Sequence, residues 1–261
     1  MESFDMELVD TRFNAIYRTI GETLLYTPDH CITSKDGEEL SELVDFRFCL
    51  QDQQSCFATC RGMSIPYLKG EVDFYMSGSP FVKDIAKHSK FWEKISDDGR
   101  CINSNYGKLL FHDRNLHGYT QFEYAMEMLL RNKDSKKAVM VIYHRDHSYK
   151  SKDNPCTMFL QFLIRNNKLS LYVKMRSSDM WFGLPYDVPF FCYVQFLMWR
   201  KLTKTYTDLL LGQYWHQATS LHLYKRNTEQ LRLELSKERP KENSQADLFR
   251  EIFVPYLSWG D

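Results

Sequence analysis

The chain has 261 residues, enough to bury one large core, and its 34 basic and 34 acidic side chains leave no net charge. This balance argues against a nucleic-acid or membrane-surface partner. Seven cysteines without a Cys-x-x-Cys pair favour reduced thiols. Residues 1–10 carry four acids, unlike a signal peptide, and the longest apolar stretch, residues 188–199, is too short to span a bilayer. We therefore expect a single cytoplasmic domain over residues 1–261.

The spacing of apolar residues predicts three helices, over residues 10–27, 68–77 and 120–132. Pro28 and Asp29 end the first of them, and a polar loop is expected over residues 33–42. Each helix places its apolar residues on one face, which indicates packing against a common core.

The middle of the chain changes to a strand pattern. Short apolar runs at residues 138–143, 158–165 and 168–175 predict strands, and Asn166-Asn167 predicts a tight turn between the last two. A buried helix with Pro189 in its first turn is expected over residues 189–202. These elements together predict a mixed α/β fold. Later, residues 231–247 are charged and predict a surface segment, whereas the apolar residues 252–259 are expected to dock.

Several side chains allow both a chemical and a structural interpretation. Cys156 precedes a predicted strand and is either a nucleophile or a buried structural thiol. His144 and His147 do not make up a metal-ligand set, so no metal is expected. Glu71 lies in a helical pattern whose plain interpretation is a solvent-facing position. Asp187, two residues before Pro189, either caps a helix or contacts a ligand.

Three sequence blocks, taken in order, resemble the thymidylate synthase family. They are Pro155-Cys156-Thr157, the run RSSDMWFGLPYDV that begins at Arg176, and His222-Leu223-Tyr224. The resemblance extends over about residues 70–227. It implies an α/β (α+β) fold with a mixed sheet, a central buried helix and a homodimer formed through the sheet. It also implies a pyrimidine nucleoside monophosphate and 5,10-methylenetetrahydrofolate as ligands.

The resemblance also implies a role for each matching residue. Cys156 is expected to add as a thiolate to carbon 6 of the base, with Glu71 and Tyr106 handling protons nearby. Arg176 is expected to bind the 5′-phosphate and to lower the pKa of Cys156. The other implied contacts are Ser177, Gln161, Lys136 and Lys137 for the nucleotide, His222 and Tyr224 for its 3′-hydroxyl, and Asp179, Trp92 and Gly183 for the folate.

Asp187 stands where thymidylate synthases typically carry asparagine. The amide accepts from the uracil ring N–H and donates to the 4-oxygen, whereas cytosine presents an amine donor and a ring nitrogen that accepts. A carboxyl group that keeps a proton suits cytosine. The resemblance therefore predicts a deoxycytidylate hydroxymethylase that acts on dCMP, in which water traps a methylene intermediate and Glu71 organises that water.

Several short segments favour the same branch and a phage source, with action in the host cytoplasm. They are residues 81–85, residues 101–107, Cys156-Thr157 and Ser220-Leu221-His222. Lys136-Lys137 depart from the family, which usually has paired arginines at that place, and Arg47 is only a weak match to its N-terminal phosphate-binding arginine.

Three alternatives stay open at this point. The first is a CMP hydroxymethylase of nucleoside-antibiotic synthesis, and the second is a thymidylate synthase that methylates dUMP. The third is a nucleotide-binding relative without catalysis. Cys156, Glu71 and Tyr106 argue against the third, because binding alone needs none of them.

Overall fold

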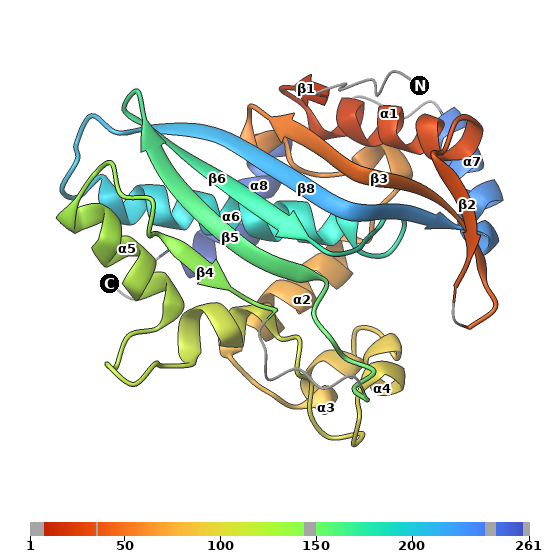
Figure 1. Ribbon diagram of the computed structural model, residues 1–261, viewed down its shortest axis with the longest axis horizontal. Coiled ribbons are helices and arrows are strands. Elements are labelled where there is room, and N and C mark those ends of the chain that lie inside the picture. Colours follow the sequence, from red (N-terminus) through yellow and green to blue (C-terminus); the bar gives the residue numbers. More distant parts are fainter. Residues whose placement is uncertain (1–7, 35, 144–149, 238–243, 258–261) are drawn as a thin grey trace.

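A computed structural model describes residues 8–34, 36–143, 150–237 and 244–257. Its centre is an eight-stranded mixed sheet with the order β1-β3-β8-β6-β5-β4, in which β2 pairs with β3 and β7 pairs with β8 (Figure 1). The β1–β3, β6–β8 and β7–β8 pairs are parallel and the others antiparallel, so the predicted mixed sheet is confirmed. The strands are β1 (Leu8–Asp10), β2 (His30–Thr33), β3 (Glu39–Leu50), β4 (Val139–Val141), β5 (Thr157–Arg165), β6 (Lys168–Met175), β7 (Ser178–Asp179) and β8 (Leu210–Tyr224).

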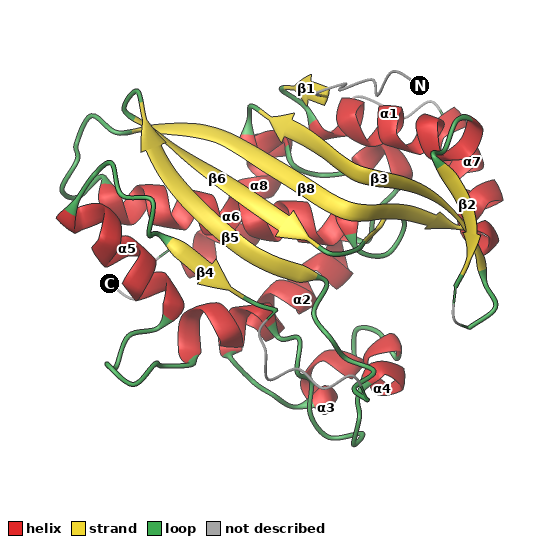
Figure 2. Cartoon of the chain, in the orientation of Figure 1, coloured by secondary structure: helices red, strands yellow, loops and turns green. Residues whose placement is uncertain are grey.

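Helices cover one face of this sheet. Figure 2 shows α6 and α8 behind the strands, whereas no described helix crosses the face turned toward the viewer. None of the described helices is long and apolar enough to cross a membrane. The helices are α1 (Phe13–Tyr26), α2 (Ile65–Ser77), α3 (Val82–Ala86), α4 (Phe91–Ile95), α5 (Gln121–Arg131), α6 (Leu184–Leu202), α7 (Thr228–Ser236) and α8 (Gln245–Phe253).

Helix α6 is the predicted central helix, and it is buried over most of its length. It begins at Leu184, so the expected start at Pro189 is wrong. Pro185 occupies the first turn, where a missing N–H costs nothing, and Pro189 lies one turn further inside the helix. The earlier start places Asp187 within the first turn of α6.

The long strand β3 was not expected from the sequence. Residues 39–42 form its start, so the predicted polar loop is wrong there and covers only the connection between β2 and β3. Polar side chains at Glu39, Ser41 and Glu42 are compatible with a strand because they lie on a sheet region that is partly exposed. β3 pairs with β8 from Leu40 to Leu50 and thereby brings the N-terminal region beside His222.

The remaining predicted elements are largely confirmed. α1, α2 and α5 match the three predicted helices, and Thr120 begins α5 with a reciprocal capping box. Asn166 and Asn167 both have positive φ, +50° and +57°, as a tight β5–β6 hairpin requires. At the C-terminal end Phe253 docks as expected and stacks on Tyr193 of α6, with ring centroids 4.9 Å apart.

Candidate active site

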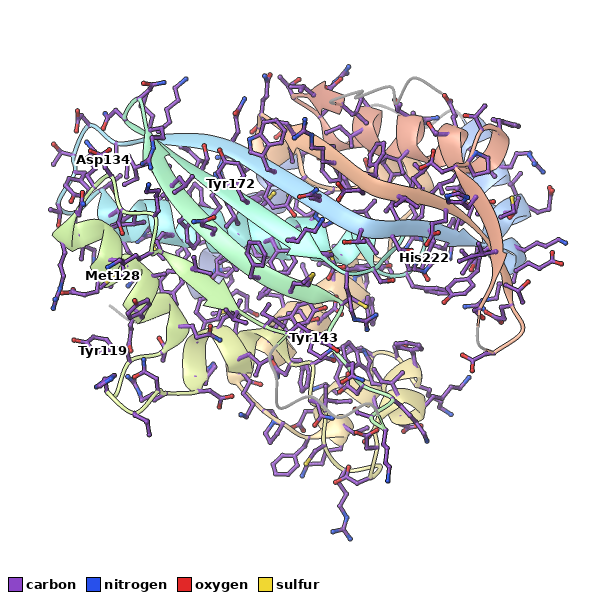
Figure 3. The ribbon with its side chains drawn as sticks, viewed as in Figure 1. Tyr119, Met128, Asp134, Tyr143, Tyr172 and His222 are labelled. Atoms are coloured by element: carbon purple, nitrogen blue, oxygen red, sulfur yellow. The ribbon has the colours of Figure 1, made fainter. Side chains whose placement is uncertain are left out.

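Cys156 lies at the end of a loop, directly before β5, and Arg176 braces that loop. The Arg176 guanidinium donates from Nε to the Pro155 carbonyl (2.9 Å) and from Nη2 to the Asn154 carbonyl (2.8 Å). Its backbone N–H also donates to the Cys156 carbonyl, at 2.9 Å. The guanidinium lies 5.9 Å from the ring centroid of Tyr143, which Figure 3 labels at this end of the sheet. Arg176 is exposed, so it also faces solvent beside the thiol.

The Cys156 thiol stays protonated in the free protein. Burial raises its pKa to about 11, Arg176 lowers it, and the carboxyls of Asp187, Asp179 and Asp153 raise it further. Arg176 therefore acts in the expected direction, but the expectation of a net lowered pKa is wrong for the free protein. Because the thiolate is the nucleophile, Cys156 must lose its proton before or during attack on a substrate.

Asp153 joins the loop of Cys156 to the segment that leads into Tyr106. The Asp153 side chain is buried, and its Oδ2 accepts from the backbone N–H groups of Asn103 (2.5 Å) and Ser104 (3.0 Å). Cys156 follows Asp153 by three residues, and Tyr106 follows Asn103 by three. One carboxylate thus fixes two segments that carry candidate catalytic groups.

We expect Asp153→Ala to destabilise the fold by roughly 2 kcal/mol, because it leaves the buried Ser104 N–H and the partly buried Asn103 N–H without an acceptor. Asp153→Asn keeps an acceptor oxygen and should cost much less. The Asn variant should also alkylate faster at Cys156, because a charge that raises the thiol pKa is gone. Urea unfolding and mass-spectrometric mapping of the alkylated Cys156 peptide test both effects. Equal stability losses in the two variants would contradict the role given to Asp153.

Asp187 contributes a carboxyl group with a raised pKa to this site. It lies in the first turn of α6, but Gly183 is the N-cap residue and no side chain caps the helix, so the helix-cap interpretation is wrong. Burial raises the pKa of Asp187 well above its usual range, and the nearby carboxyls of Glu71 and Asp179 raise it further. A Cβ at Gly183 would lie 3.3 Å from Asp187 Oδ2, so glycine leaves room for this carboxyl.

Glu71 is buried and accepts two hydrogen bonds, so its interpretation as a solvent-facing residue is wrong. Its Oε1 accepts from the hydroxyls of Tyr67 (3.1 Å) and Tyr75 (3.3 Å), which lie one turn before and after it on α2. Trp92 donates from Nε1 to the Tyr67 hydroxyl at 3.1 Å. Burial raises the pKa of Glu71 to about 7, although both tyrosines lower it. Such a pKa suits a group that gives and takes protons near neutral pH.

The raised pKa of Glu71 makes stability depend on pH. Between about pH 4.5 and 7 the folded chain holds a proton that the unfolded chain has released, so this contribution is complete below pH 4.5 and is lost as pH rises through 7. We expect Glu71→Gln to exceed the wild type in free energy of unfolding by about 3 kcal/mol near pH 8 and by little near pH 4. Denaturant unfolding at both pH values measures this, and a difference independent of pH would contradict it.

Tyr106 packs between Tyr75 of α2 and Phe191 of α6, with ring centroids 5.6 Å and 5.9 Å away. Gly107 permits this approach, because a Cβ there would lie 2.0 Å from the Tyr75 carbonyl oxygen. Burial raises the pKa of Tyr106 well above its usual range, and the charges of Asp187 and Cys156 raise it further. Tyr106 therefore remains a hydroxyl donor beside both groups.

Asp179, His222 and Tyr224 form the other side of the site. Asp179 on β7 pairs with His222 on β8, and its Oδ1 accepts from the N–H groups of Trp181 (2.7 Å) and Phe182 (3.1 Å). Burial raises the pKa of Asp179, whereas His222 and these two N–H groups lower it. The His222 ring, labelled in Figure 3, meets the Tyr224 ring edge-on at 5.1 Å. Asp179 also interacts electrostatically with the thiol, because its carboxylate raises the pKa of Cys156.

Gln161, Lys136 and Lys137 were expected to contact the nucleotide. They lie near the β4 edge of the sheet, with Gln161 on the face opposite the buried side chains of β5. Gln161 alternates along β5 with the buried Leu160 and Phe162, and it donates to the Lys136 carbonyl at 2.9 Å. Lys136 and Lys137 are exposed just before the edge strand β4. Their contact with a nucleotide stays a prediction, as do the folate contacts of Trp92 and Gly183.

Two further features bear on the site. The described residue ranges hold no group of three His, Cys, Asp or Glu side chains that could bind a metal ion, and His144 and His147 lie outside them. A surface cavity of about 310 Å³ shares no residue with the candidate site. The candidate site is therefore identified from its side chains and their pKa shifts, and not from this cavity. This cavity is lined by Arg12, Asn14, Ala15, Arg18, Ser55 and Gln245.

Sequence patterns missed three side chains that shape the site. Tyr67 and Asp153 act through the hydrogen bonds described above. Arg61 is buried, with its guanidinium carbon 4.4 Å from the Trp181 ring centroid, and it donates to the Tyr186 hydroxyl at 3.2 Å. Only the spacing of Tyr67 four residues before Glu71 was visible in the sequence as a signal.

The sequence of the chain is similar to those of several known proteins. Residues 17–252 match the thymidylate synthase family. The deoxycytidylate 5-hydroxymethyltransferase of Enterobacteria phage T4 is 29% identical over 214 residues, which cover 75% of this chain and 80% of the phage protein. Its counterpart in phage T6 is 30% identical over 215 residues with the same coverage. The thymidylate synthase of Mycoplasma mobile is 28% identical over 157 residues, 60% of this chain and 50% of that protein.

A solved structure shares the fold of this chain. The structure of thermostable thymidylate synthase A from Bacillus subtilis superposes with a TM-score of 0.68 at 19% identity, covering 91% of this chain and 92% of that one. The sheet with its central helix and the family match define a one-carbon transferase. The chain belongs to the thymidylate synthase family.

Proposed function

We propose that this protein is a deoxycytidylate 5-hydroxymethylase, which converts dCMP to 5-hydroxymethyl-dCMP. The feature that carries the proposal is the carboxyl of Asp187, whose pKa burial raises well above its usual range and whose charge acts on the Cys156 thiol. One carboxyl oxygen accepts from the cytosine amine, and the acid proton can pass to the ring nitrogen N3. Uracil has an N–H at this place and cannot take the proton. The similarity to the phage T4 and T6 enzymes supports the same substrate.

Cys156 begins the proposed reaction. Its thiol gives its proton to water as the sulfur bonds to carbon 6 of the base, the ring electrons move toward N3, and the Asp187 proton neutralises the charge that develops there. Carbon 5 thereby becomes nucleophilic. Arg176 assists by lowering the pKa of the thiol, and its exposed guanidinium is placed to bind the 5′-phosphate together with Ser177.

Bound 5,10-methylenetetrahydrofolate would supply the one-carbon unit, and Asp179, Trp92 and Gly183 are proposed to face it. Tyr106 remains protonated, so it orients a water that receives the carbon-5 proton. Loss of the carbon-5 proton would break the bond from the methylene carbon to the folate nitrogen, so that tetrahydrofolate leaves. The ionised form of Glu71 then takes a proton from a second water as that water's oxygen bonds to the methylene carbon on carbon 5. The bond between Cys156 sulfur and carbon 6 breaks, which restores the ring double bond, releases the thiolate and returns the proton on N3 to Asp187.

His222 and Tyr224 are proposed to bind the sugar 3′-hydroxyl from the β8 side of the site. Both carry groups that can donate to or accept from a hydroxyl, and their rings are held at 5.1 Å from each other. This arrangement recognises the 3′ position and leaves the choice between deoxyribose and ribose to experiment. CMP is therefore one of the substrates to be compared.

A homodimer through the open face of the sheet is part of the proposal. Tyr172, labelled on this face in Figure 3, is 37% exposed and stacks on Trp215 with centroids 6.3 Å apart. Such apolar surface is typical of a region that a second copy covers. Lys136 and Lys137 at the neighbouring edge would then reach toward the nucleotide of the second copy. Sedimentation should give twice the 31.2-kDa chain mass, and a single-chain mass would contradict this part.

Product analysis tests the proposed reaction. The protein is incubated with dCMP and 5,10-methylenetetrahydrofolate, and the mass of the nucleotide and the oxidation state of the released folate are measured. We expect a hydroxymethyl product with tetrahydrofolate. A methyl product with dihydrofolate would identify a methylating synthase instead, and tight dCMP binding without any product would identify a non-catalytic relative.

A further inference from the structure

The hydrogen bonds around Glu71 are strongly one-sided. Tyr67, Glu71 and Tyr75 follow one another at four-residue spacing on α2, so their side chains share one face of the helix. Both tyrosine hydroxyls donate to the same oxygen, Oε1, at 3.1 Å and 3.3 Å. Within the described part of the chain, both hydrogen bonds of the Glu71 carboxyl reach Oε1 and none reaches Oε2. The two oxygens of one carboxyl group thus have different surroundings.

The direction of the Tyr67 hydroxyl is fixed by Trp92. The indole N–H can only donate, and it donates to the Tyr67 oxygen at 3.1 Å. The Tyr67 hydrogen is therefore free to point at Glu71. Tyr75 is buried and stacked against Tyr106, which fixes its ring as well. The orientation of each donor is therefore fixed by its neighbours in the fold.

We propose that Tyr67 and Tyr75 are positioning residues that confine the exchangeable proton of Glu71 to Oε2, with Trp92 holding Tyr67 in this role. An oxygen that already accepts two O–H groups acts as the carbonyl oxygen of a protonated carboxyl, so the acid hydrogen belongs to the other oxygen. The inference rests on the proposed function for its catalytic meaning: Oε2 is the atom that takes the proton from the attacking water.

Around Glu71, the titratable groups are Tyr67 and Tyr75 on its own helix and Asp187 on α6. The phenols favour the ionised form of Glu71 because they donate to it. Apart from burial, the two phenols are the groups that shift the pKa of Glu71, whereas Asp187 has its own pKa raised by burial and by Glu71. The titration of Glu71 therefore reports mainly on the two phenol donors.

The test measures the titration of Glu71 by isotope-edited infrared spectroscopy, with its band identified by its loss in Glu71→Gln. Tyr67→Phe and Tyr75→Phe should each raise the pH midpoint by about one unit, because each removes one donor to the ionised form. Each should also shift the C=O band of the acid to higher frequency, and the double variant should show the sum. Tyr206→Phe is the matched control, because its hydroxyl donates to the Leu129 and Leu130 carbonyls instead.

Trp92→Phe keeps an aromatic ring and removes the N–H, so its midpoint should follow that of Tyr67→Phe. An unchanged midpoint and band in both tyrosine variants would overturn the placement of the proton. An unchanged midpoint in Trp92→Phe alone would overturn the role of Trp92. With dCMP, the tyrosine variants should lose kcat about tenfold while KM stays constant. Shifts in the infrared titration without any turnover in the wild type would leave the proton placement standing and contradict the proposed function.

Discussion

Cys156→Ala should abolish turnover of dCMP, with a loss on the order of 10⁶-fold as for other covalent nucleophiles. The methyl group cannot form the bond to carbon 6, and no other described cysteine carries the same combination of partial exposure, Arg176 and three neighbouring carboxyls. Binding of dCMP should survive, because the proposed phosphate and sugar contacts come from Arg176, His222 and Tyr224. Steady-state kinetics and calorimetric titration measure the two properties separately.

The control for this variant is Cys31→Ala, which removes an exposed thiol from β2. It should turn over like the wild type. Turnover by Cys156→Ala at the wild-type rate would contradict the nucleophile assignment, and so would a loss that appears equally in Cys31→Ala.

Asp187→Asn should change the preference between the two bases. The ratio of kcat/KM for dCMP to that for dUMP should fall by about 10³ or more, because the amide cannot give an acid proton to N3 and its carbonyl accepts from the uracil N–H. Stability should change little at acidic pH, since Asp187 is neutral in the fold and does not cap α6. The same enzyme preparation assayed on both nucleotides gives the ratio directly.

Asp247→Asn is the matched control, because it makes the same change at an exposed position in the first turn of α8. Its ratio should equal that of the wild type. If Asp187→Asn keeps the wild-type ratio as well, Asp187 does not select the base, and the case for a cytosine substrate loses its main support.

The elements of this fold followed from periodicity where the pattern was long and regular. The helix α1, the β5–β6 hairpin and the apolar centre of α6 were predicted within a few residues. The start of α6 was misplaced because two prolines compete for the first turn, and Pro185 occupies it. Strand β3 was missed because its first residues are polar and resemble a loop.

The candidate site was predictable only through motifs that carry their own spacing. One short motif contains Cys156, and a second contains Arg176, Asp179 and Asp187. In the structure, the charges of the second motif act on the Cys156 thiol. Glu71 was placed at the surface by its helical pattern alone, because the donors that bury it were not part of that pattern.

The supporting contacts of the site were beyond sequence reasoning for a physical reason. Asp153 accepts from Asn103, which lies 50 residues earlier in the chain, and Trp92 reaches Tyr67 from a different helix. Such pairs arise from tertiary packing, and single-sequence periodicity contains no information about them. The same holds for pKa values: burial outweighs Arg176 at the Cys156 thiol, and only a structure gives the extent of burial.

Release of tritium from carbon-5-labelled nucleotides tests the central claim most directly. The protein is given dCMP, CMP or dUMP with 5,10-methylenetetrahydrofolate, and the release of label is followed together with the mass of the product. The account predicts release from dCMP, slower or no release from dUMP, and a hydroxymethyl product, and the rate with CMP shows whether ribose is accepted. Preferred release from dUMP with a methyl product would contradict the role of Asp187, and no release from any of the three would contradict catalysis itself.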